Sequence, residues 1–142
     1  MSTVTTASAA YVRPPGVLHT LLLAGSVSLF LGALLSDYTY YTTYQIQWSN
    51  FASWLNAGAL LFAGLALVFA LVNLLRARPM AGQPLNYFVL LLSFVIGLVN
   101  AFQHAKDAWA LMPTGLVLSA IVFILICITA VVGLNPRSGG LK

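Results

Sequence analysis

The chain has 142 residues, of which 61% are hydrophobic and only 6% are charged, and its mean hydropathy is +0.96. Because soluble domains carry about a quarter of charged residues, this composition excludes an ordinary water-soluble protein and places most of the chain in lipid. The net charge of +4 comes from basic residues scattered near the ends of apolar stretches. Nucleic-acid binding needs a clustered basic face, so we expect no nucleic-acid partner.

Four apolar stretches dominate the sequence, at residues 17–35, 51–75, 85–105 and 114–134. Each is close to the roughly 20 residues that a helix needs to cross a bilayer. The predicted fold class is therefore all-α, an integral membrane four-helix bundle. We expect residues 1–14 to be a flexible tail, residues 15–135 to be a single transmembrane domain, and residues 136–142 to be a C-terminal tail.

Polar or turn-forming segments separate these stretches. Residues 37–47 are polar and rich in Tyr and Thr, residues 78–84 contain two Pro and a Gly, and residues 106–113 form a short polar link. Segments of this composition are typical of loops. We therefore expect three short loops and no separate domain outside the membrane.

Basic residues predict the orientation. Only Lys106 falls on the side of the first and third loops, whereas the tails and the second loop hold the rest: Arg13, Arg76, Arg78, Arg137 and Lys142. Because cytoplasmic loops carry an excess of Lys and Arg, both termini are predicted to be cytoplasmic. Asp37 and Asp107 are accordingly expected on the opposite side, which is periplasmic or extracellular.

Aromatic residues gather on that predicted periplasmic side, which holds all three Trp and four of the six Tyr. One interpretation is an aromatic belt at the membrane interface. The other is a docking surface for a protein partner or a quinone-like ring, since aromatic side chains also anchor interfaces. The candidate interface residues are Tyr38, Tyr41, Tyr44, Trp48, Trp54 and Trp109.

Small residues predict how the helices pack, because close backbone approach drives helix association in lipid. The first stretch repeats small residues every four positions: Ala24, Ser28, Gly32 and Ser36. The second alternates steps of four and three: Ala52, Asn56, Ala59, Ala63, Ala66, Ala70 and Asn73. The first two helices are therefore expected to form a tight antiparallel hairpin. Gly115 and Ser119 give the fourth stretch a shorter seam.

Polar residues inside the stretches are the candidate sites, since they are costly in lipid unless they face the bundle interior. The third stretch has one polar face that leads toward the periplasm: Ser93, Gly97, Asn100, His104 and Asp107. His104 is interpreted either as a hydrogen-bonded interfacial residue or as part of a site for a proton, a metal or a quinone. His19, with Ser26 on the same face, is expected near the cytoplasmic end.

The depth of each candidate ligand in the membrane restricts which cofactors the chain could hold. The two histidines differ in depth by roughly 20 to 25 Å, which excludes one haem held by both. A haem held by His104 and Met112 stays open, as does a divalent ion held by His104, Asp107 and Asp37. We found no catalytic Ser/His/Asp arrangement, phosphate loop or paired intramembrane carboxylates, and expect no autonomous catalysis. Cys127 is expected to pack as an apolar side chain.

The first half of the chain also resembles a known family. The residues that carry the resemblance are the run from His19 to Phe30, then Asp37 and Tyr40, then the run from Trp48 to Leu55. They are similar to a bacterial family of predicted four-helix inner-membrane proteins of unknown function, whose pattern opens with His-Pro-x-His-Pro. Thr20 and Ser26 stand at its proline positions. Members often occur beside periplasmic redox proteins, so the resemblance implies a multi-pass subunit of a redox module in the bacterial inner membrane, with Asp37 and Asp107 on the periplasmic side.

Three functions are therefore carried forward. The first is a non-catalytic membrane subunit that anchors or organises a complex, with a periplasmic redox protein as a candidate partner. The second is an electron carrier that binds haem or a quinone at His104, Met112, Asn100 or His19. The third is a small homo-oligomeric channel, in which Asn56 or Asn100 would form rings around a central axis.

Overall fold

The computed structural model describes residues 16–76, 83–106 and 108–134, all of which lie in helices or in their short connections. The helices are α1 (Val17–Thr43), α2 (Ile46–Leu75), α3 (Gln83–His104), α4 (Ala108–Leu111) and α5 (Thr114–Leu134). Four of them are long and apolar enough to span a membrane, and α4 is a single turn. The predicted all-α four-helix membrane bundle is confirmed. The two expected tails lie outside the described residues.

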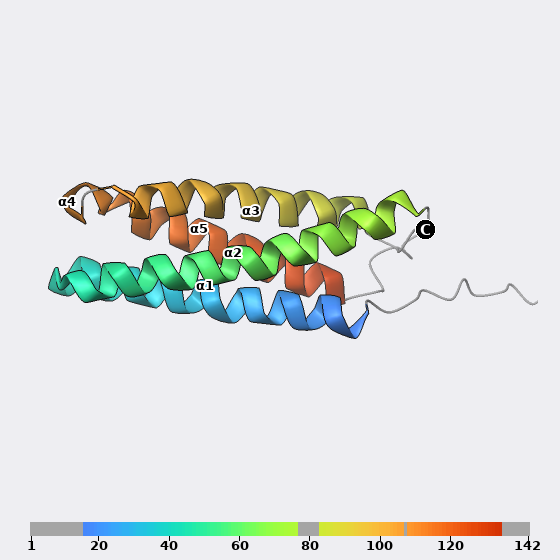
Figure 1. The fold of residues 1–142 in the computed structure, drawn as a ribbon, viewed down its shortest axis with the longest axis horizontal. Helices are drawn as coiled ribbons and strands as arrows, with labels where there is room; N and C mark the ends of the chain where they lie inside the picture. The colour runs from blue at the N-terminus through green and yellow to red at the C-terminus, as the bar shows by residue number, and fades with distance from the viewer. Residues whose placement is uncertain (1–15, 77–82, 107, 135–142) are drawn as a thin grey trace, which may run out of the picture.

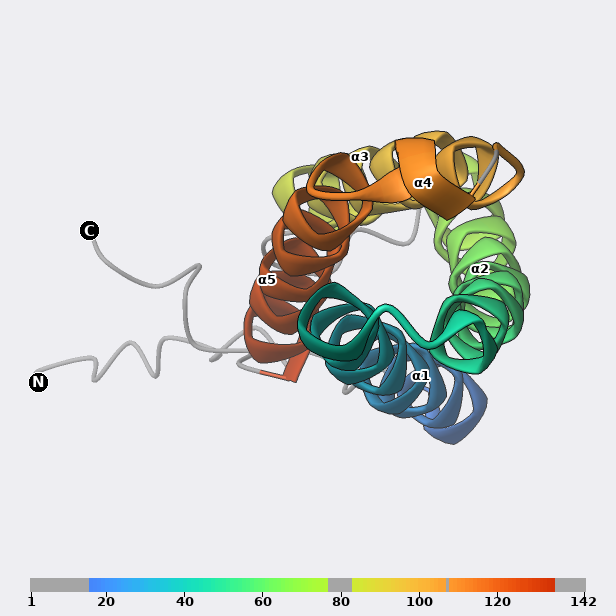
Figure 2. The ribbon, with the colours of Figure 1, turned by 90° about the vertical axis from the view of Figure 1, so that its left-hand side faces the viewer.

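The four long helices form a closed ring of neighbours. Viewed end-on, α1 lies beside α2 and α5, and α3 lies beside the same two helices from the other side (Figure 2). α1 and α3 therefore face each other across one diagonal of the bundle. A side chain that joins them must pass through the interior.

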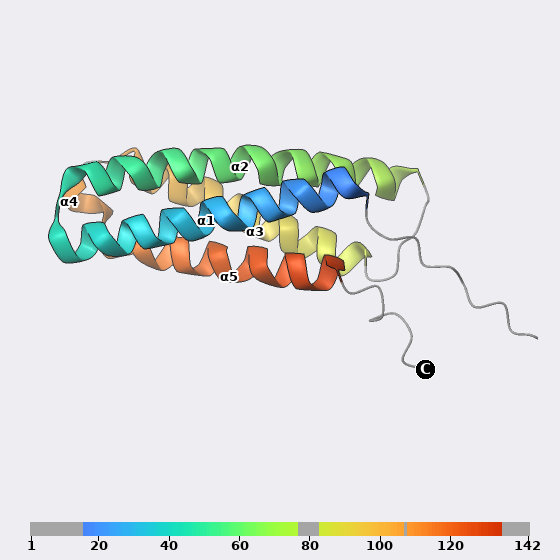
Figure 3. The ribbon, with the colours of Figure 1, turned by 90° about the horizontal axis from the view of Figure 1, so that it is seen from below.

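The two ends of the bundle differ. One end carries the turn between α1 and α2 together with α4, and the other carries the starts of α1 and α3 and the ends of α2 and α5 (Figures 1 and 3). We name them the His104 end and the His19 end after the histidine that each contains. α4 was not foreseen, because residues 106–113 were expected to be a loop without regular structure.

α1 is longer than its apolar stretch. The polar composition predicts a loop from residue 37, but the helix continues to Thr43. The threonines of this segment bond back to carbonyls in the preceding turn: Thr39 Oγ1 donates to Leu35 O at 2.8 Å and Thr43 Oγ1 to Thr39 O at 2.7 Å. Hydroxyls satisfied in this way let a polar segment stay helical. Asp37 consequently lies inside a helix and not at a loop edge.

The turn between α1 and α2 is short. Tyr44 caps α1 in the left-handed conformation with φ of 55°, and its N–H donates to Tyr40 O at 2.7 Å. A left-handed residue at this position is a common way to end a helix. Ile46 then begins α2, five residues earlier than expected. The two helices are thus held as an antiparallel hairpin.

α2 turns its small residues inward. Ala52, Asn56, Ala59, Ala63 and Ala66 are all completely buried. Their alternation of four and three residues keeps them on one face of the helix. The core beside them is apolar and includes Phe30, Leu90, Val122 and Ile126.

The seam expected on α1 is partly wrong. Gly32 and Ser36 turn inward, but Ala24 and Ser28 are exposed. A strict four-residue repeat advances about 40° per step around a helix of 3.6 residues per turn, so its first and last members cannot face one neighbour. The close approach to α2 lies at Gly25 instead, where an added Cβ would stand 2.7 Å from the Phe62 ring.

Candidate functional site

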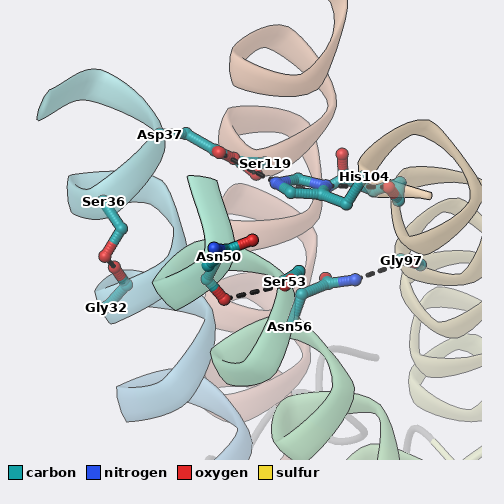
Figure 4. A network of polar contacts seen from close by, with 10 residues as sticks. Gly32, Ser36, Asp37, Asn50, Ser53, Asn56, Gly97, His104 and Ser119 are labelled. Atoms are coloured by element: carbon teal, nitrogen blue, oxygen red, sulfur yellow. Dashed lines mark hydrogen bonds and ion pairs between the residues drawn. The ribbon is translucent and has the colours of Figure 1, made fainter. Parts of the chain in front are cut away.

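The centre of the His104 end is a direct contact between α1 and α3. His104 Nε2 lies 2.9 Å from Asp37 Oδ1, and both side chains are almost fully buried, at 1% and 0% exposure. The other ring nitrogen, Nδ1, donates to the carbonyl of Asn100 at 2.9 Å. This second bond fixes the orientation of the ring. The pair joins the two helices across the diagonal of the bundle (Figure 4).

α5 contributes a third group. Ser119 Oγ donates a short hydrogen bond to Asp37 Oδ2, and Asn100 Nδ2 donates to Ser119 Oγ at 2.8 Å. Each of the two carboxylate oxygens and both ring nitrogens therefore has a partner. We call these four residues, Asp37, Asn100, His104 and Ser119, the polar network. It connects α1, α3 and α5 in a part of the bundle that excludes solvent.

The network contains the residue types of a serine hydrolase, which the sequence analysis did not foresee, but not their order. In a catalytic triad the histidine lies between serine and carboxylate, where it removes the serine proton. Here Asp37 lies in the middle, with Ser119 on one oxygen and His104 on the other. The histidine is therefore not positioned to activate Ser119, which is also only 2% exposed.

α2 reaches the same region through Asn56. Its Nδ2 donates to the carbonyl of Gly97 at 3.2 Å, one turn before Asn100 (Figure 4). The side-chain oxygens of Asn56 and Asn100 are buried and have no hydrogen-bond partner in the protein. Both amides have a forced orientation, because each NH₂ group faces an acceptor. The interior next to the polar network thus contains two side-chain oxygens that can accept a further hydrogen bond.

The other candidate residues of α3 share this inward face. Ser93 is completely buried and donates to Leu90 O at 2.8 Å, and Gly97 is also buried. An added Cβ at Gly97 would stand 3.0 Å from Leu60 and 3.3 Å from Phe30. Gly97 therefore lets a side chain from α1 and one from α2 meet α3 at one level.

His19 lies at the opposite end and belongs to a different environment. Its Nδ1 is buried without a hydrogen-bond partner, and the ring also bonds the backbone of Ala66 on α2. Ser26, two turns further along α1, donates to Leu22 O at 2.9 Å and does not reach the histidine. The structure thus brings His104 and Asp37 together and keeps His19 apart from both.

The candidate metal and haem ligands are only partly assembled. His104 and Asp37 bond each other, and Asp107 lies outside the described residues. No group of three His, Cys, Asp or Glu side chains occurs in the described part of the chain. Met112 is half-buried between α4 and α5. His104 and Met112 are not arranged to hold one haem iron, because both ring nitrogens of His104 already take part in hydrogen bonds.

The aromatic candidates form an exposed rim around the same end. Trp109 is 82% exposed and Trp54 is 80% exposed, and Tyr44 stacks on Trp109 with ring centroids 6.2 Å apart. Tyr38, Tyr41 and Trp48 are exposed as well, whereas Tyr40 is buried. We call Tyr38, Tyr41, Tyr44, Trp48, Trp54 and Trp109 the aromatic rim.

Ser119 is the network residue that the sequence analysis missed as a site, since it was interpreted only as part of a packing seam. The position of Ser119 along its helix could have identified it as a site residue. Ser119 lies five residues inside the start of α5, about 7.5 Å along the helix axis. Asp37 lies six residues before the end of α1, at a similar depth of about 9 Å from that end.

Comparisons with known proteins place this arrangement in a family but not in a functional class. No curated protein and no solved structure matches the sequence. A family described as "Predicted membrane protein (DUF2231)" matches residues 15–136, which include all five helices and so extend well beyond the first-half resemblance. The chain belongs to this family of multi-pass membrane proteins of unknown function.

Proposed function

We propose that this chain is a non-catalytic subunit of the bacterial inner membrane that anchors or organises a membrane complex. The observation that carries the proposal is the aromatic rim, whose two most exposed members, Trp54 and Trp109, stand on different helical segments at one end of the bundle. Trp and Tyr are enriched at the centres of protein interfaces, where they bury a large area with few rotatable bonds. Beneath the rim, the polar network bonds mainly to itself.

We assign the rim to the periplasmic side. The helix ends next to the basic segments, at Val17, Leu75 and Leu134, all belong to the His19 end (Figure 1). The positive-inside rule favours a cytoplasmic position for that end. A partner at the rim would then be a periplasmic or membrane protein, and a redox protein is the class that the family resemblance favours.

The two alternatives have less support. A haem iron needs a free ring nitrogen, and His104 has none as it is placed. A quinone carbonyl needs a donor, but the unpartnered oxygens of Asn56 and Asn100 are acceptors. His104 as placed therefore does not fit a haem iron, and these two oxygens do not fit a quinone carbonyl. Asn56 and Asn100 are buried within the protomer, so they do not form rings around an axis between protomers.

Gentle extraction from the native membrane tests the proposal. We expect the wild-type chain to migrate as a complex with a second protein, and the Trp54→Ala/Trp109→Ala variant to migrate without it. Phe88→Ala is the matched control, because Phe88 is an exposed aromatic residue (61%) near the His19 end of α3. The absorption spectrum of the same complex reports whether the partner carries a redox cofactor. A stable, partnerless wild-type monomer would contradict the proposal.

A further inference from the structure

The proton count of the polar network restricts what the Asp37–His104 pair can be. A carbonyl oxygen can only accept, so His104 Nδ1 must carry a proton to bond Asn100 O. Ser119 Oγ accepts from Asn100 Nδ2, and its own proton therefore goes to Asp37 Oδ2. Only the 2.9 Å contact between His104 Nε2 and Asp37 Oδ1 has an undetermined proton.

That contact can hold no proton, one proton or two. With one proton it is either an imidazolium facing a carboxylate or a neutral imidazole facing a carboxylic acid, and the pair has no net charge in both cases. With no proton, a nitrogen lone pair faces a carboxylate. With two protons, a cationic N–H faces a protonated acid. Either change leaves a net charge in a site where neither side chain is more than 1% exposed.

We propose that the Asp37–His104 pair is an intramembrane proton-binding site, and that gain or loss of its single shared proton releases α1 from α3. The pair hydrogen-bonds α1 to α3, and the bond from Ser119 to the same carboxylate ties α1 to α5. Release of the pair would loosen the diagonal of the bundle and leave the apolar packing of the His19 end in place.

The surroundings contain little else that titrates. On α1 the titratable Tyr40 is buried, α2 supplies the neutral Asn56, and a Cβ added at Gly115 of α5 would stand 3.8 Å from His104 Cε1. Lys106 is exposed. No other charged side chain in the described ranges faces the pair, and Asp107 lies outside them.

Thermal unfolding of the full chain in detergent or nanodiscs, followed across pH, tests the proposal. We expect the wild-type Tm to be highest at an intermediate pH and to fall by about 5 to 10 °C on both sides. In Asp37→Asn/His104→Gln one amide can donate to the other, but neither side chain titrates. The Tm of this variant should therefore not change with pH. His19→Gln, the matched control, should retain the wild-type profile. A flat wild-type profile, a wild-type profile in the double variant, or loss of the profile in His19→Gln would overturn the proposal.

Infrared spectroscopy provides a second measurement that needs no change at the pair. Asp37 and Asp107 are the only acidic side chains of the sequence, so Asp107→Asn leaves Asp37 as the single side-chain carboxyl. The Asp37 carboxyl changes its protonation in only one of the two steps, which are the gain of a second proton at low pH and the loss of the shared proton at high pH. The C=O stretch of a protonated carboxyl should therefore be present at one pH extreme, absent at the other, and change in step with Tm. A band that stays unchanged across the whole range would overturn the proposal.

Discussion

The two ends of the bundle each contain a histidine, and the hydrogen bonds of the two rings differ. At the His104 end the ring bonds a carboxylate and a carbonyl, and a serine from a third helix donates a hydrogen bond to the second carboxylate oxygen. At the His19 end the ring nitrogen Nδ1 is buried without a partner, and no acidic side chain of the described residues lies on α2 or α5 to meet it. A polar side chain in a membrane bundle thus links helices only where a complementary partner stands at its depth.

The largest expected effect is the removal of one partner at the His104 end. His104→Leu leaves Asp37 buried with Ser119 as its only remaining partner in the network, and breaking a buried pair on one side costs about 3 to 5 kcal/mol. We expect a loss of this size in the free energy of unfolding, measured by denaturant titration in mixed micelles. A loss below about 1 kcal/mol would mean that the pair does not hold the bundle.

The closest approach of α1 to α2 should be the next most sensitive point. Gly25→Ala places a Cβ where the Phe62 ring stands only 2.7 Å away, and overpacking of this kind costs about 1 to 3 kcal/mol. The same denaturation assay measures the loss. Gly25→Ala/Phe62→Leu should recover most of it, because the smaller side chain makes room. Equal losses in the single and double variants would place the clash elsewhere.

A smaller effect is expected at Asn56. Asn56→Leu removes the hydrogen bond to Gly97 but also removes a buried oxygen without a partner, and an apolar side chain of similar size replaces both. The two contributions oppose each other, so we expect a change within about 1 kcal/mol. Asn100→Leu is the comparison, because Asn100 also donates to Ser119 and its loss should cost more.

The smallest effect is expected at the His19 end. His19→Gln keeps a polar side chain of similar length and affects no bond to another side chain that the structure records, so we expect a change below about 0.5 kcal/mol. Denaturation of His19→Gln beside His104→Gln compares the two ends directly. A loss at His19 as large as the loss at His104 would contradict the difference between them.

The long helices could be predicted from hydropathy alone, because lipid requires long apolar runs with internal backbone bonds. The inward stripe of α3 followed from periodicity, and the structure places Ser93, Gly97 and Asn100 in the interior. The end of α1 could not be found in this way. Its Tyr and Thr residues are typical of a loop in composition, whereas in the structure the segment is helical and its Thr39 and Thr43 hydroxyls bond to carbonyls of the preceding turn.

The polar network was less accessible to the sequence than the helices. His104 and Asp37 were grouped only as candidate ligands of a surface ion, because Asp37 was expected at a loop edge. Ser119 was assigned to packing. The missing information was the diagonal relation of α1 to α3, which depends on how four helices close into a ring and not on the pattern of any one of them (Figure 2).

A double-mutant cycle between Asp37 and His104 tests most directly whether this diagonal pair holds the His104 end together. The cycle compares Asp37→Leu, His104→Leu and the double variant by the free energy of unfolding. We predict that the double variant loses at least about 2 kcal/mol less than the sum of the two single losses, because the second substitution removes the unpaired group that the first one leaves. Losses that simply add would contradict the account.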